Sequence, residues 1–214
     1  SSLIDANELN ATIKKFCPTM MVVGENFKLD KIKFKIDKVY STNNYNIFKT
    51  RFKKKQTVNH KILLLLGTSG STGNQKWVKL SKKNLISNLT SISKELKINN
   101  NDITITTMPP EYTYGLSIIN SHLFNGAKIV LNNYSVVQKE FWKNLKLYKV
   151  SSFGGVPFMY EILDKLKFHN FLNKTNIKYL TQAGGKLDAN LHEKINIGCQ
   201  ANKINFYVMY GSTE

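Results

Sequence analysis

A glycine-rich segment carries the clearest chemical signature in this sequence. It reads LLLLGTSGSTGNQK from Leu63 to Lys76, so that glycine recurs at every third position after a run of leucines. Glycine lets backbone N–H groups approach an anion closely, and the lysine adds a mobile positive charge. The glycines and hydroxyl donors of this segment are Gly67, Thr68, Ser69, Gly70, Ser71, Thr72 and Gly73. The segment is therefore expected to hold a chain of phosphate oxygens.

Two familiar phosphate loops do not fit this spacing. A Walker A loop needs Gly-x-x-x-x-Gly-Lys followed by Ser or Thr, and a dinucleotide-binding loop needs Gly-x-Gly-x-x-Gly. A flexible Ser/Gly linker is the competing interpretation. A linker would not be expected directly between a buried strand, here predicted at Ile62 to Leu66, and a helix capped by Ser81.

The segment resembles the phosphate loop of the adenylate-forming superfamily, which includes acyl-CoA synthetases, peptide-synthetase adenylation domains and luciferases. The family signature is Thr-Ser-Gly-[Ser/Thr]-Thr-Gly-x-Pro-Lys-Gly. Lys76 is in register with it, whereas Gln75 replaces the usual proline and Trp77 the usual glycine. Two further segments follow in the family's order. TQAGGKL, from Thr181 to Leu187, resembles the turn that wraps the adenine, and YGSTE, from Tyr210 to Glu214, matches Tyr-Gly-x-Thr-Glu.

The resemblance implies a role for each matched residue, with ATP as the nucleotide. Tyr210 would stack on the adenine, Thr213 would touch the α-phosphate, and Glu214 would help to hold Mg²⁺. Lys76, Thr213 and Glu214 form the implied catalytic set. A carboxylate beside phosphate oxygens suits Mg²⁺, and a flat aromatic ring suits a purine. The other implied nucleotide-binding residues are Thr68, Ser69, Gly70, Ser71, Thr72, Gly73, Gly184, Gly185, Lys186 and Gly211.

Two other segments resemble walls of the family's acid pocket. MPPEYTYGL, ending at Leu116, resembles Pro-Leu-Phe-His-x-x-Gly, with Gly115 in register and Tyr112 where many members have histidine. The stretch from Gly154 to Pro157 resembles a Gly-Val-Pro stretch lining the same pocket. The resemblance thus implies Tyr112, Gly115 and Gly155 as substrate-pocket residues. Simple packing is an equally open interpretation of Tyr112.

The reaction implied by the resemblance activates a carboxylic acid in two steps. The carboxylate attacks the α-phosphorus of MgATP to give an acyl-adenylate and pyrophosphate, and a thiol of CoA or of a carrier protein then captures the acyl group. Such a reaction needs positioning and charge neutralisation rather than a protein nucleophile. A non-catalytic nucleotide-binding remnant and a basic nucleic-acid-binding module remain alternatives.

The resemblance covers most of the chain from about residue 1, but family members extend further in both directions. The Thr-Gly-Asp segment that binds the ribose and the small C-terminal domain with its catalytic lysine have no counterpart in the 214 residues. We therefore expect residues 1–214 to form the central part of a large N-terminal AMP-binding domain. We also expect this stretch by itself to be inactive.

Apolar periodicity predicts the elements that must position these segments. Short apolar runs alternate with stripes of 3.6-residue period, which favours an α/β fold with mostly parallel sheets flanked by helices. Helices are expected over residues 3–16, from Ser81 to about Leu96, and over 115–124, 137–148, 157–166 and 188–197, with Asp188 as a cap. Strands are expected at 19–23, 62–66, 103–107, 128–131, 177–181 and 204–209. Residues 24–60 give the least readable pattern.

Composition excludes several other classes of protein. Hydrophobic residues make up 42% and charged residues 21%, as in folded globular proteins. The longest apolar runs are far shorter than the roughly 20 residues needed to cross a bilayer. Two distant cysteines and four scattered histidines argue against a disulfide scaffold or a zinc ribbon. The N-terminus lacks a signal-peptide pattern, so we expect a cytoplasmic protein.

The net charge of +17 raises the question of a nucleic-acid partner. Among the 31 basic residues, however, Arg51 is the only arginine, whereas base and phosphate recognition favours the forked guanidinium. Asparagine is also abundant, so the lysine excess resembles a genome-wide base composition. We therefore expect most basic residues to lie on solvated faces, no membrane span, and a nucleic acid only as the less favoured partner.

Overall fold

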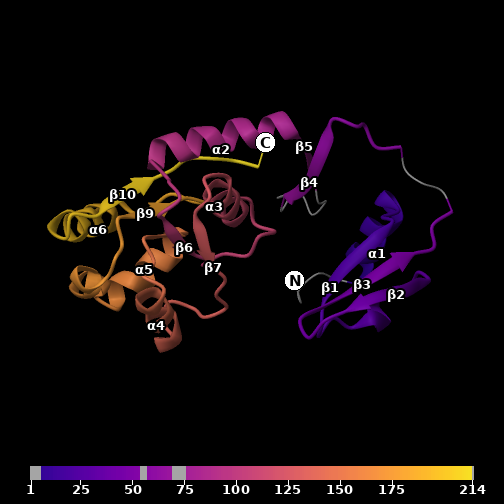
Figure 1. Cartoon of the computed structure of the whole chain (residues 1–214), viewed down its shortest axis with the longest axis horizontal. Helices are drawn as coiled ribbons and strands as arrows, with labels where there is room; N and C mark the ends of the chain where they lie inside the picture. The colour runs from indigo at the N-terminus through magenta and orange to yellow at the C-terminus, as the bar shows by residue number, and fades with distance from the viewer. Residues whose placement is uncertain (1–5, 54–56, 69–75, 214) are drawn as a thin grey trace. The chain divides into compact units, whose positions relative to one another are not determined.

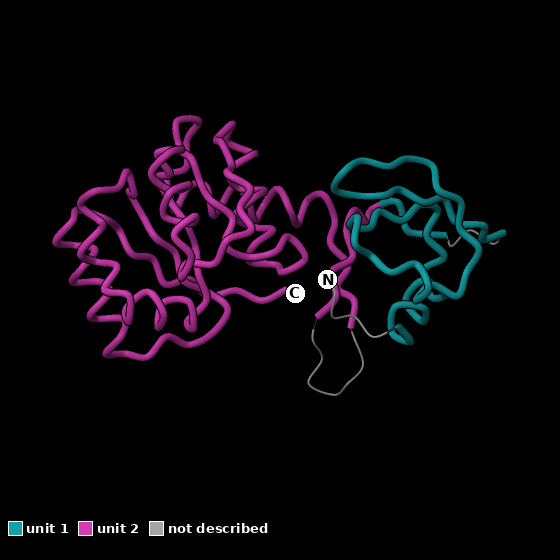
Figure 2. Tube along the Cα trace, turned by 90° about the horizontal axis from the view of Figure 1, so that it is seen from below, with its two compact units in different colours: residues 1–60 teal, residues 61–214 magenta. Residues whose placement is uncertain are grey.

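The computed structural model describes residues 6–53, 57–68 and 76–213. The chain divides into two compact units, residues 1–60 and residues 61–214, shown in Figures 1 and 2. Six of the residues assigned to the site from the sequence lie outside the described residues: Ser69, Gly70, Ser71, Thr72, Gly73 and Glu214.

The first unit is a helix followed by a small antiparallel sheet. Its elements are α1 (Ala6–Phe16), β1 (Met20–Gly24), a 3-10 turn η1 (Leu29–Lys31), β2 (Ile36–Ser41) and β3 (Tyr45–Thr50), with strand order β1-β3-β2. Asn10 joins the helix to the following segment, because its side chain accepts from the Lys33 N–H at 2.8 Å and donates to the Lys31 carbonyl at 2.6 Å. The prediction of mostly parallel sheets does not extend to this unit, and β2 and β3 lie in the part of the sequence that gave no readable pattern.

The second unit contains a parallel five-stranded sheet with the order β10-β9-β8-β6-β7. The strands are β6 (Ile103–Ile105), β7 (Lys128–Val130), β8 (Ser152–Gly155), β9 (Tyr179–Gln182) and β10 (Asn205–Val208). The helices are α2 (Lys82–Leu96), α3 (Thr113–Phe124), α4 (Lys139–Leu147), α5 (Pro157–Lys165) and α6 (Ala189–Ala201), with a 3-10 segment η2 (Phe168–Lys174). The predicted α/β fold with a parallel sheet flanked by helices is confirmed (Figure 1).

The two faces of this sheet are covered by different helices. Neighbouring residues of β9 point to opposite faces, as the pleat of a strand requires. Leu180 belongs to a buried cluster with Phe141 of α4 and Ile195 of α6, whereas Tyr179 packs with Leu96 of α2. The sheet is therefore an inner layer between two helical layers, which explains why all four residues of β8 and all four of β9 are buried.

The order of the strands creates a switch point in the sheet. From β6 the chain moves to β7 on one side and then returns to β8 on the other side of β6. In open α/β sheets, the crevice at the carboxyl ends of two such strands is the usual place for a ligand. The segments that leave β6 and β8 therefore border the place where a ligand is expected.

The strand predicted before the phosphate loop is present, but the prediction that it is buried is wrong. Within the described part of the chain, strand β4 (Ile62–Thr68) pairs with β5 (Lys76–Ser81) in an antiparallel two-stranded hairpin. Leu63 is 63% exposed, and Leu66 is the leucine of this run that is buried. Leu64 and Leu65 are half-buried. A two-stranded ribbon has no neighbouring strands that would extend it into a covered sheet, so it leaves part of its apolar surface in contact with solvent. Strand β5 was not predicted.

Local signals at helix starts are confirmed. Ser81 caps α2, because its hydroxyl accepts from the Asn84 N–H at 3.2 Å and the Asn84 side chain accepts in return from the Ser81 N–H. Asp188 caps α6 by accepting from the N–H groups of Asn190 and Leu191 at 3.0 and 3.1 Å. Pro157 occupies the first turn of α5. Capping needs only residues within one turn, so the sequence contains the whole signal.

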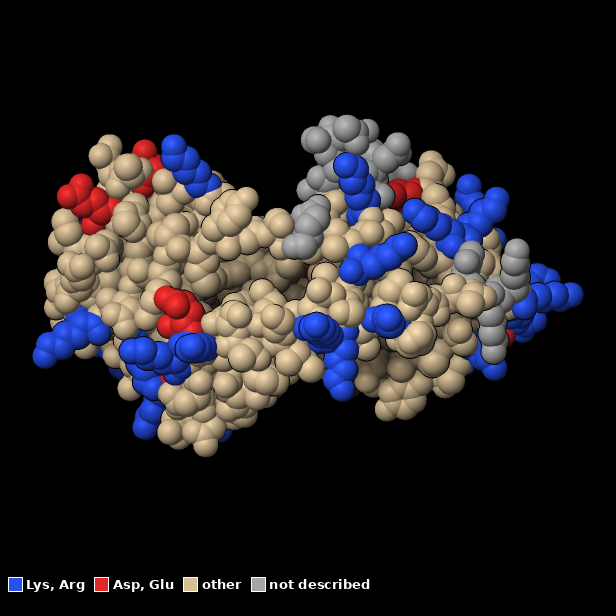
Figure 3. Space-filling model, turned by 90° about the horizontal axis from the view of Figure 1, so that it is seen from above, with Lys and Arg blue, Asp and Glu red and all other residues tan. Residues whose placement is uncertain are grey.

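The basic side chains of the described residues are dispersed over the surface, as the sequence analysis expected for most of them. Figure 3 shows basic side chains in separate small groups with acidic side chains among them on the face drawn. Within residues 6–53, 57–68 and 76–213, no helix has the length and apolar character that a membrane span requires.

Candidate functional site

A cavity of about 200 Å³ lies at the carboxyl ends of β9 and β10, and we call it the β9–β10 cavity. Five of the residues assigned from the sequence line it: Tyr112, Gly184, Tyr210, Gly211 and Thr213. Its other lining residues are Asn88, Ile92, Thr113, Tyr114, Ser117, Ala183, Met209 and Ser212. Three segments that are far apart in the sequence are thus brought to one place.

The sheet itself explains why two of these segments meet. Strands β9 and β10 are parallel neighbours, so the residues that follow them leave the sheet at the same edge. The pairing continues one step past β10, where the Met209 N–H donates to the Gln182 carbonyl at 2.7 Å. Gly184 and Tyr210 therefore emerge side by side.

Gly184 occupies a position that only glycine fits without strain. Its φ is +83°, in the region that side chains disfavour. A Cβ atom added there would also lie 2.2 Å from the Tyr112 hydroxyl and 3.2 Å from Cγ1 of Val156. The close approach shows that the Tyr112 side chain lies against the turn after β9.

The segment after β10 is tied to the start of helix α3. The hydroxyls of Thr213 and Thr113 lie 3.0 Å apart and share a hydrogen bond. Thr113 is the first residue of α3, whose N-cap residue Tyr112 makes no side-chain capping bond. Partial positive charge gathers at the first turn of a helix, so Thr213 is held where an anion would be stabilised.

Tyr210 is fully exposed, so its ring is available to stack on a flat group. Gly185 and Lys186 are also exposed, at the turn that follows Gly184, but neither lines the β9–β10 cavity.

The hairpin of β4 and β5 carries Thr68 and Lys76 at its open end. The two residues are direct partners in the strand register, and the Thr68 hydroxyl donates to the Lys76 carbonyl at 3.5 Å. The Lys76 side chain is exposed. Neither residue lines the β9–β10 cavity.

The hairpin nevertheless borders the same region through its other residues. A cavity of about 400 Å³ is lined by Leu66 and Leu80 of the hairpin together with Thr113, Ser212 and Thr213. The last three residues also line the β9–β10 cavity. The two cavities are thus neighbours on either side of Thr213.

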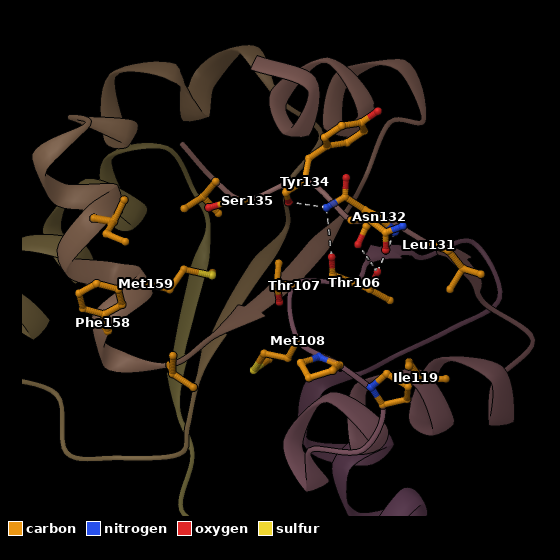
Figure 4. A pocket seen from close by; sticks show the side chains of 16 residues that line it. Thr106, Thr107, Met108, Ile119, Leu131, Asn132, Tyr134, Ser135, Phe158 and Met159 are labelled. Carbon is orange, nitrogen blue, oxygen red and sulfur yellow. Dashed lines mark hydrogen bonds between the residues drawn. The ribbon is translucent and has the colours of Figure 1, made fainter. Parts of the chain in front are cut away.

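A third cavity, of about 650 Å³, lies at the switch point between β6 and β8 (Figure 4), and we call it the β6–β8 cavity. Its lining consists of Thr106, Thr107, Met108, Pro109, Pro110, Ile119, Leu131, Asn132, Asn133, Tyr134, Ser135, Val136, Val156, Phe158, Met159 and Ile162. None of these sixteen side chains is charged. Thr106 and Asn132 close one wall, since the Asn132 N–H donates to the Thr106 hydroxyl at 2.8 Å.

The residues assigned to the acid pocket do not line the β6–β8 cavity, although their neighbours do. Gly115 packs against the preceding loop, where an added Cβ would lie 2.4 Å from the Pro109 carbonyl oxygen. Gly155 is buried in β8, where an added Cβ would meet the Met159 side chain at 2.3 Å. Tyr112 lines the β9–β10 cavity instead.

A buried polar cluster lies close to the β9–β10 cavity, and the sequence analysis missed it. The Tyr114 and Thr181 hydroxyls lie 2.6 Å apart, and the Tyr160 hydroxyl donates to the Thr181 carbonyl at 2.8 Å. His122 Nδ1 donates to the Ile118 carbonyl at 2.8 Å, and its Nε2 lies 3.0 Å from the Tyr179 hydroxyl. Tyr114, Ile118 and His122 recur every four residues, so helical spacing was the available signal.

Burial sets the ionisation of this cluster. Burial raises the pKa of Tyr179 to about 12 and raises that of Tyr114 further still. Burial also lowers the pKa of His122, despite the Ile118 carbonyl that favours its protonated form. All three side chains are therefore neutral near pH 7, and they act as hydrogen-bonding groups rather than as charges.

The described residues offer no ready metal centre. Among residues 6–53, 57–68 and 76–213, no three His, Cys, Asp or Glu side chains come together in a way that could hold a metal ion. The acidic residue assigned to Mg²⁺, Glu214, is outside that part of the chain.

A match to a known protein family spans nearly the whole sequence. The profile of the AMP-binding enzyme family matches residues 3–214. Among curated proteins, the chain is 26% identical over 155 residues to an oxalate–CoA ligase of Arabidopsis thaliana, covering 70% of the chain and 30% of that protein. It is 23% identical over 137 residues to a luciferin 4-monooxygenase of Nipponoluciola cruciata, covering 63% of the chain and 25% of that enzyme.

Solved structures show the same fold. A long-chain-fatty-acid–CoA ligase of Archaeoglobus fulgidus superposes with a TM-score of 0.59 at 20% identity, over 72% of the chain and 32% of the ligase. An O-succinylbenzoate coenzyme A synthetase of Bacillus subtilis in complex with AMP superposes with a TM-score of 0.57 at 24% identity, over 70% of the chain and 30% of the synthetase. The chain thus spans between a quarter and a third of the length of these proteins.

Proposed function

The chain belongs to the AMP-binding enzyme family, and from this premise we propose that it binds ATP in the β9–β10 cavity and helps to activate a carboxylic acid as an acyl-adenylate. The observation that carries the proposal is the meeting of Tyr112, Gly184, Tyr210 and Thr213 in one cavity. These residues come from three separate segments, each of which resembles a different family motif.

The adenine would lie between the Tyr210 ring and the turn at Gly184. An exposed aromatic ring provides apolar area for a purine, and a glycine turn lets the backbone approach the edge of the base. The support for this assignment is the exposure of Tyr210 and its emergence beside Gly184 at the same edge of the sheet. Gly211, which follows Tyr210, would leave room for the sugar.

The α-phosphate would lie at Thr213, beside the first turn of α3. The Thr113 hydroxyl fixes the Thr213 side chain at 3.0 Å, so the donor is oriented before the nucleotide arrives. The β- and γ-phosphates would then extend toward the hairpin, where Thr68 and Lys76 stand at the base of the glycine-rich loop. Ser69, Gly70, Ser71, Thr72 and Gly73 lie outside the described residues, and their phosphate contacts rest on the resemblance.

Glu214 is the residue that we assign to Mg²⁺, on the resemblance alone. A bound Mg²⁺ would neutralise charge on the phosphate oxygens. In the reaction an oxygen of the carboxylate forms a bond to the α-phosphorus, and the bond from that phosphorus to pyrophosphate breaks. No proton needs to move. The task of the chain is to align the two reactants and to stabilise negative charge, which hydroxyls, backbone N–H groups and Lys76 can do.

The second step would transfer the acyl group to a thiol of CoA or of a carrier protein. We assign the approach of the thiol to the β6–β8 cavity, because its sixteen uncharged lining residues suit a neutral, amide-bearing arm. The β6–β8 cavity would lie close to the bound nucleotide, because Val156 of this cavity and Tyr112 of the β9–β10 cavity both lie against Gly184.

The assignment of the thiol can be tested with one exposed phenylalanine. Phe158→Asp places a carboxylate in the uncharged lining at a side chain that is 67% exposed, so folding should be preserved. We expect slower thioester formation with unchanged pyrophosphate exchange. Phe171→Asp, at an exposed phenylalanine outside that lining, is the matched control. Equal effects of the two variants would contradict the assignment.

Acid-dependent exchange of labelled pyrophosphate into ATP tests the proposed function itself. The assay uses the natural protein that carries these residues, with Thr213→Val as the variant. Loss of a hydrogen bond to a charged group costs about 1.5 to 3 kcal/mol, which corresponds to a fall of about 10- to 100-fold. Thr90→Val, on the exposed face of α2, should leave the rate unchanged.

Two outcomes of this assay separate the alternatives. ATP binding without exchange for any acid would favour a non-catalytic nucleotide-binding protein. The 214-residue chain by itself is expected to show no exchange, because the family's ribose-binding aspartate and C-terminal lysine are not among its residues. Full exchange activity of the isolated 214 residues would contradict that expectation.

A further inference from the structure

We infer that Gln182 is a positioning residue for the nucleotide, because its side chain fixes the glycine turn against which the adenine would lie. The inference rests on the proposed function, and it goes beyond that proposal by naming a residue to which the sequence analysis gave no role. It comes from the contacts of Gln182 and from one polar atom of its side chain that has no partner among the described residues.

The backbone of Gln182 is held firmly in the five-stranded sheet. Gln182 is the last residue of β9 and has no exposed surface. It pairs with Gly155 of β8 on one side and with Val208 of β10 on the other. Its carbonyl also accepts from the Met209 N–H at 2.7 Å. The side chain of Gln182 therefore starts from a fixed point, at the place where the chain leaves the sheet toward Gly184.

The side chain of Gln182 ties this fixed point to the turn that follows. Its Nε2 donates to the Gly185 carbonyl at 2.9 Å. Within residues 76–213, Gly184 and Gly185 make no other hydrogen bond. Two consecutive glycines can adopt an unusually wide range of backbone conformations, and Gly184 has a φ of +83°. The bond from Gln182 therefore selects one conformation of a segment that its own sequence leaves loose.

The turn that is fixed in this way borders the proposed nucleotide site. Gly184 lines the β9–β10 cavity and lies against the Tyr112 hydroxyl. Gly185 lies against the start of α5, since a Cβ atom added there would be 3.2 Å from Cγ of Pro157. A binding surface that is ordered before the ligand arrives binds it at a lower entropic cost than one that must be ordered on binding. Loss of the bond should therefore weaken nucleotide binding and leave Thr213, which is assigned to the α-phosphate, in place.

The other polar atom of this side chain shows that the amide does little for the stability of the fold. Gln182 Oε1 is buried and has no hydrogen-bond partner in the described part of the chain. Burying an acceptor without a partner costs free energy. A methionine would fill a similar space without an unpaired polar atom. Gly185 is exposed, so water can replace the amide as the partner of its carbonyl. The gain from a glutamine at this position is therefore the bond to the turn.

The test measures KM for ATP in the pyrophosphate-exchange assay of the natural protein, with Gln182→Met as the variant. We expect KM for ATP to rise by about 3- to 10-fold, the effect of losing one hydrogen bond between neutral groups. The value of kcat should stay within about twofold of wild type, because Thr213 and Lys76 are unchanged. The midpoint of thermal unfolding should not fall, since the unpaired acceptor is removed together with the bond.

Two control variants separate positioning from a general loss of structure. Leu180→Val changes another residue of β9 with no exposed surface, two positions away and therefore on the same face of the strand. It should lower the midpoint of thermal unfolding and leave KM for ATP unchanged. Gln200→Met makes the same exchange as the test variant at an exposed glutamine of α6, and it should change neither quantity. The variants at Gln182 and Leu180 should thus respond in opposite ways.

Each outcome bears on one claim. A folded Gln182→Met protein with the wild-type KM for ATP would overturn the inference and leave the proposed function intact. A wild-type protein that neither exchanges pyrophosphate nor binds ATP would instead count against the proposed function. If Gln182→Met shows no thermal transition, Gln182→Asn takes its place, because it keeps the amide but withdraws it from the Gly185 carbonyl by one methylene group. The same rise in KM for ATP is then expected, and a wild-type KM in that variant would overturn the inference.

Discussion

Strands β4 and β8 show opposite relations between sequence and burial. Strand β4 contains four consecutive leucines, yet Leu63 is largely exposed. Strand β8 reads Ser-Phe-Gly-Gly and is buried at every residue. The difference lies in position, because β8 is an inner strand of a sheet covered on both faces, whereas β4 belongs to a two-stranded hairpin. Burial here follows the layer in which a strand lies more than the hydrophobicity of its residues.

The five-stranded sheet and the hairpin also differ in what they contribute to the molecule. The five-stranded sheet holds the buried side chains that stabilise the second unit, and it fixes the residues of the β9–β10 cavity at its edge. The hairpin contributes an exposed lysine at the base of the glycine-rich loop and only part of a packed face. We therefore expect changes in the hairpin to affect chemistry more than stability, and changes inside the sheet to affect stability first.

Lys76→Ala should give the largest effect on activity with the smallest effect on folding. Removing one preorganised positive group from a developing transition state typically lowers the rate by about 100- to 1000-fold. We expect that fall in pyrophosphate exchange, with an unchanged midpoint of thermal unfolding. Lys79→Ala, another exposed lysine of β5, is the control and should keep nearly full activity. A large loss of stability in Lys76→Ala would break the contrast between hairpin and sheet.

Asp102→Ala should give a large loss of stability. Asp102 is 1% exposed, and its carboxylate accepts from Lys178 Nζ at 2.7 Å and from the Asn99 N–H at 2.9 Å. Losing this group should lower the free energy of unfolding by about 2 to 4 kcal/mol, measured by urea denaturation. Asp164→Ala removes the more exposed pair with Lys194 and should cost at most about 1 kcal/mol. Equal losses would mean that burial does not distinguish the two pairs.

The contribution of Asp102 to the free energy of unfolding should decrease at acidic pH. Burial alone would raise the pKa of Asp102, but hydrogen bonds from Lys178, Asn99 and Ser151 together hold that pKa below its ordinary value of 3.8. The stabilisation is therefore present above pH 3.8 and is lost as the pH falls below that value.

His122, on the face of α3 that packs against Tyr179 of the sheet, provides a second titration in a milder pH range. Because burial lowers the pKa of His122 from its ordinary value of 6.5, the unfolded chain binds its proton first as the pH falls. The free energy of unfolding should then decrease below pH 6.5. His122→Gln should remove this part of the pH dependence, as measured by urea denaturation between pH 5 and 7.5. An unchanged slope in the variant would show that another group titrates.

Leu63→Ala should give the smallest effect of all. An exposed side chain away from caps and hydrogen-bond networks usually changes stability by no more than about 0.5 kcal/mol. Leu180→Ala, at a leucine of β9 with no exposed surface, should cost about 2 to 5 kcal/mol in the same urea assay. A similar cost for both leucines would mean that β4 is buried in solution.

The sequence predicted those parts of the fold that depend on neighbours along the chain. The caps at Ser81 and Asp188 and the proline at the start of α5 need only one helical turn, and they are confirmed. Strand β8 has no β-branched residue, and β2 and β3 are rich in polar residues, so their apolar pattern is weak. Their strand state depends on partners elsewhere in the chain.

The same distinction between local and long-range signals applies to the candidate site. Motifs such as those around Gly184 and Tyr210 are contiguous, so the sequence alone named them. The contact between Tyr114 and Thr181 joins residues of a helix and a strand far apart in the chain, and no local pattern encodes that pairing. The buried polar cluster around Thr181 was therefore visible only in three dimensions.

A crystal structure of the natural protein with AMP tests the central claim most directly, because it locates the nucleotide without relying on turnover. We predict that the adenine stacks on Tyr210 beside the turn at Gly184, with the phosphate within hydrogen-bond distance of the Thr213 hydroxyl. AMP bound in the β6–β8 cavity, or on residues 1–60, would contradict the account.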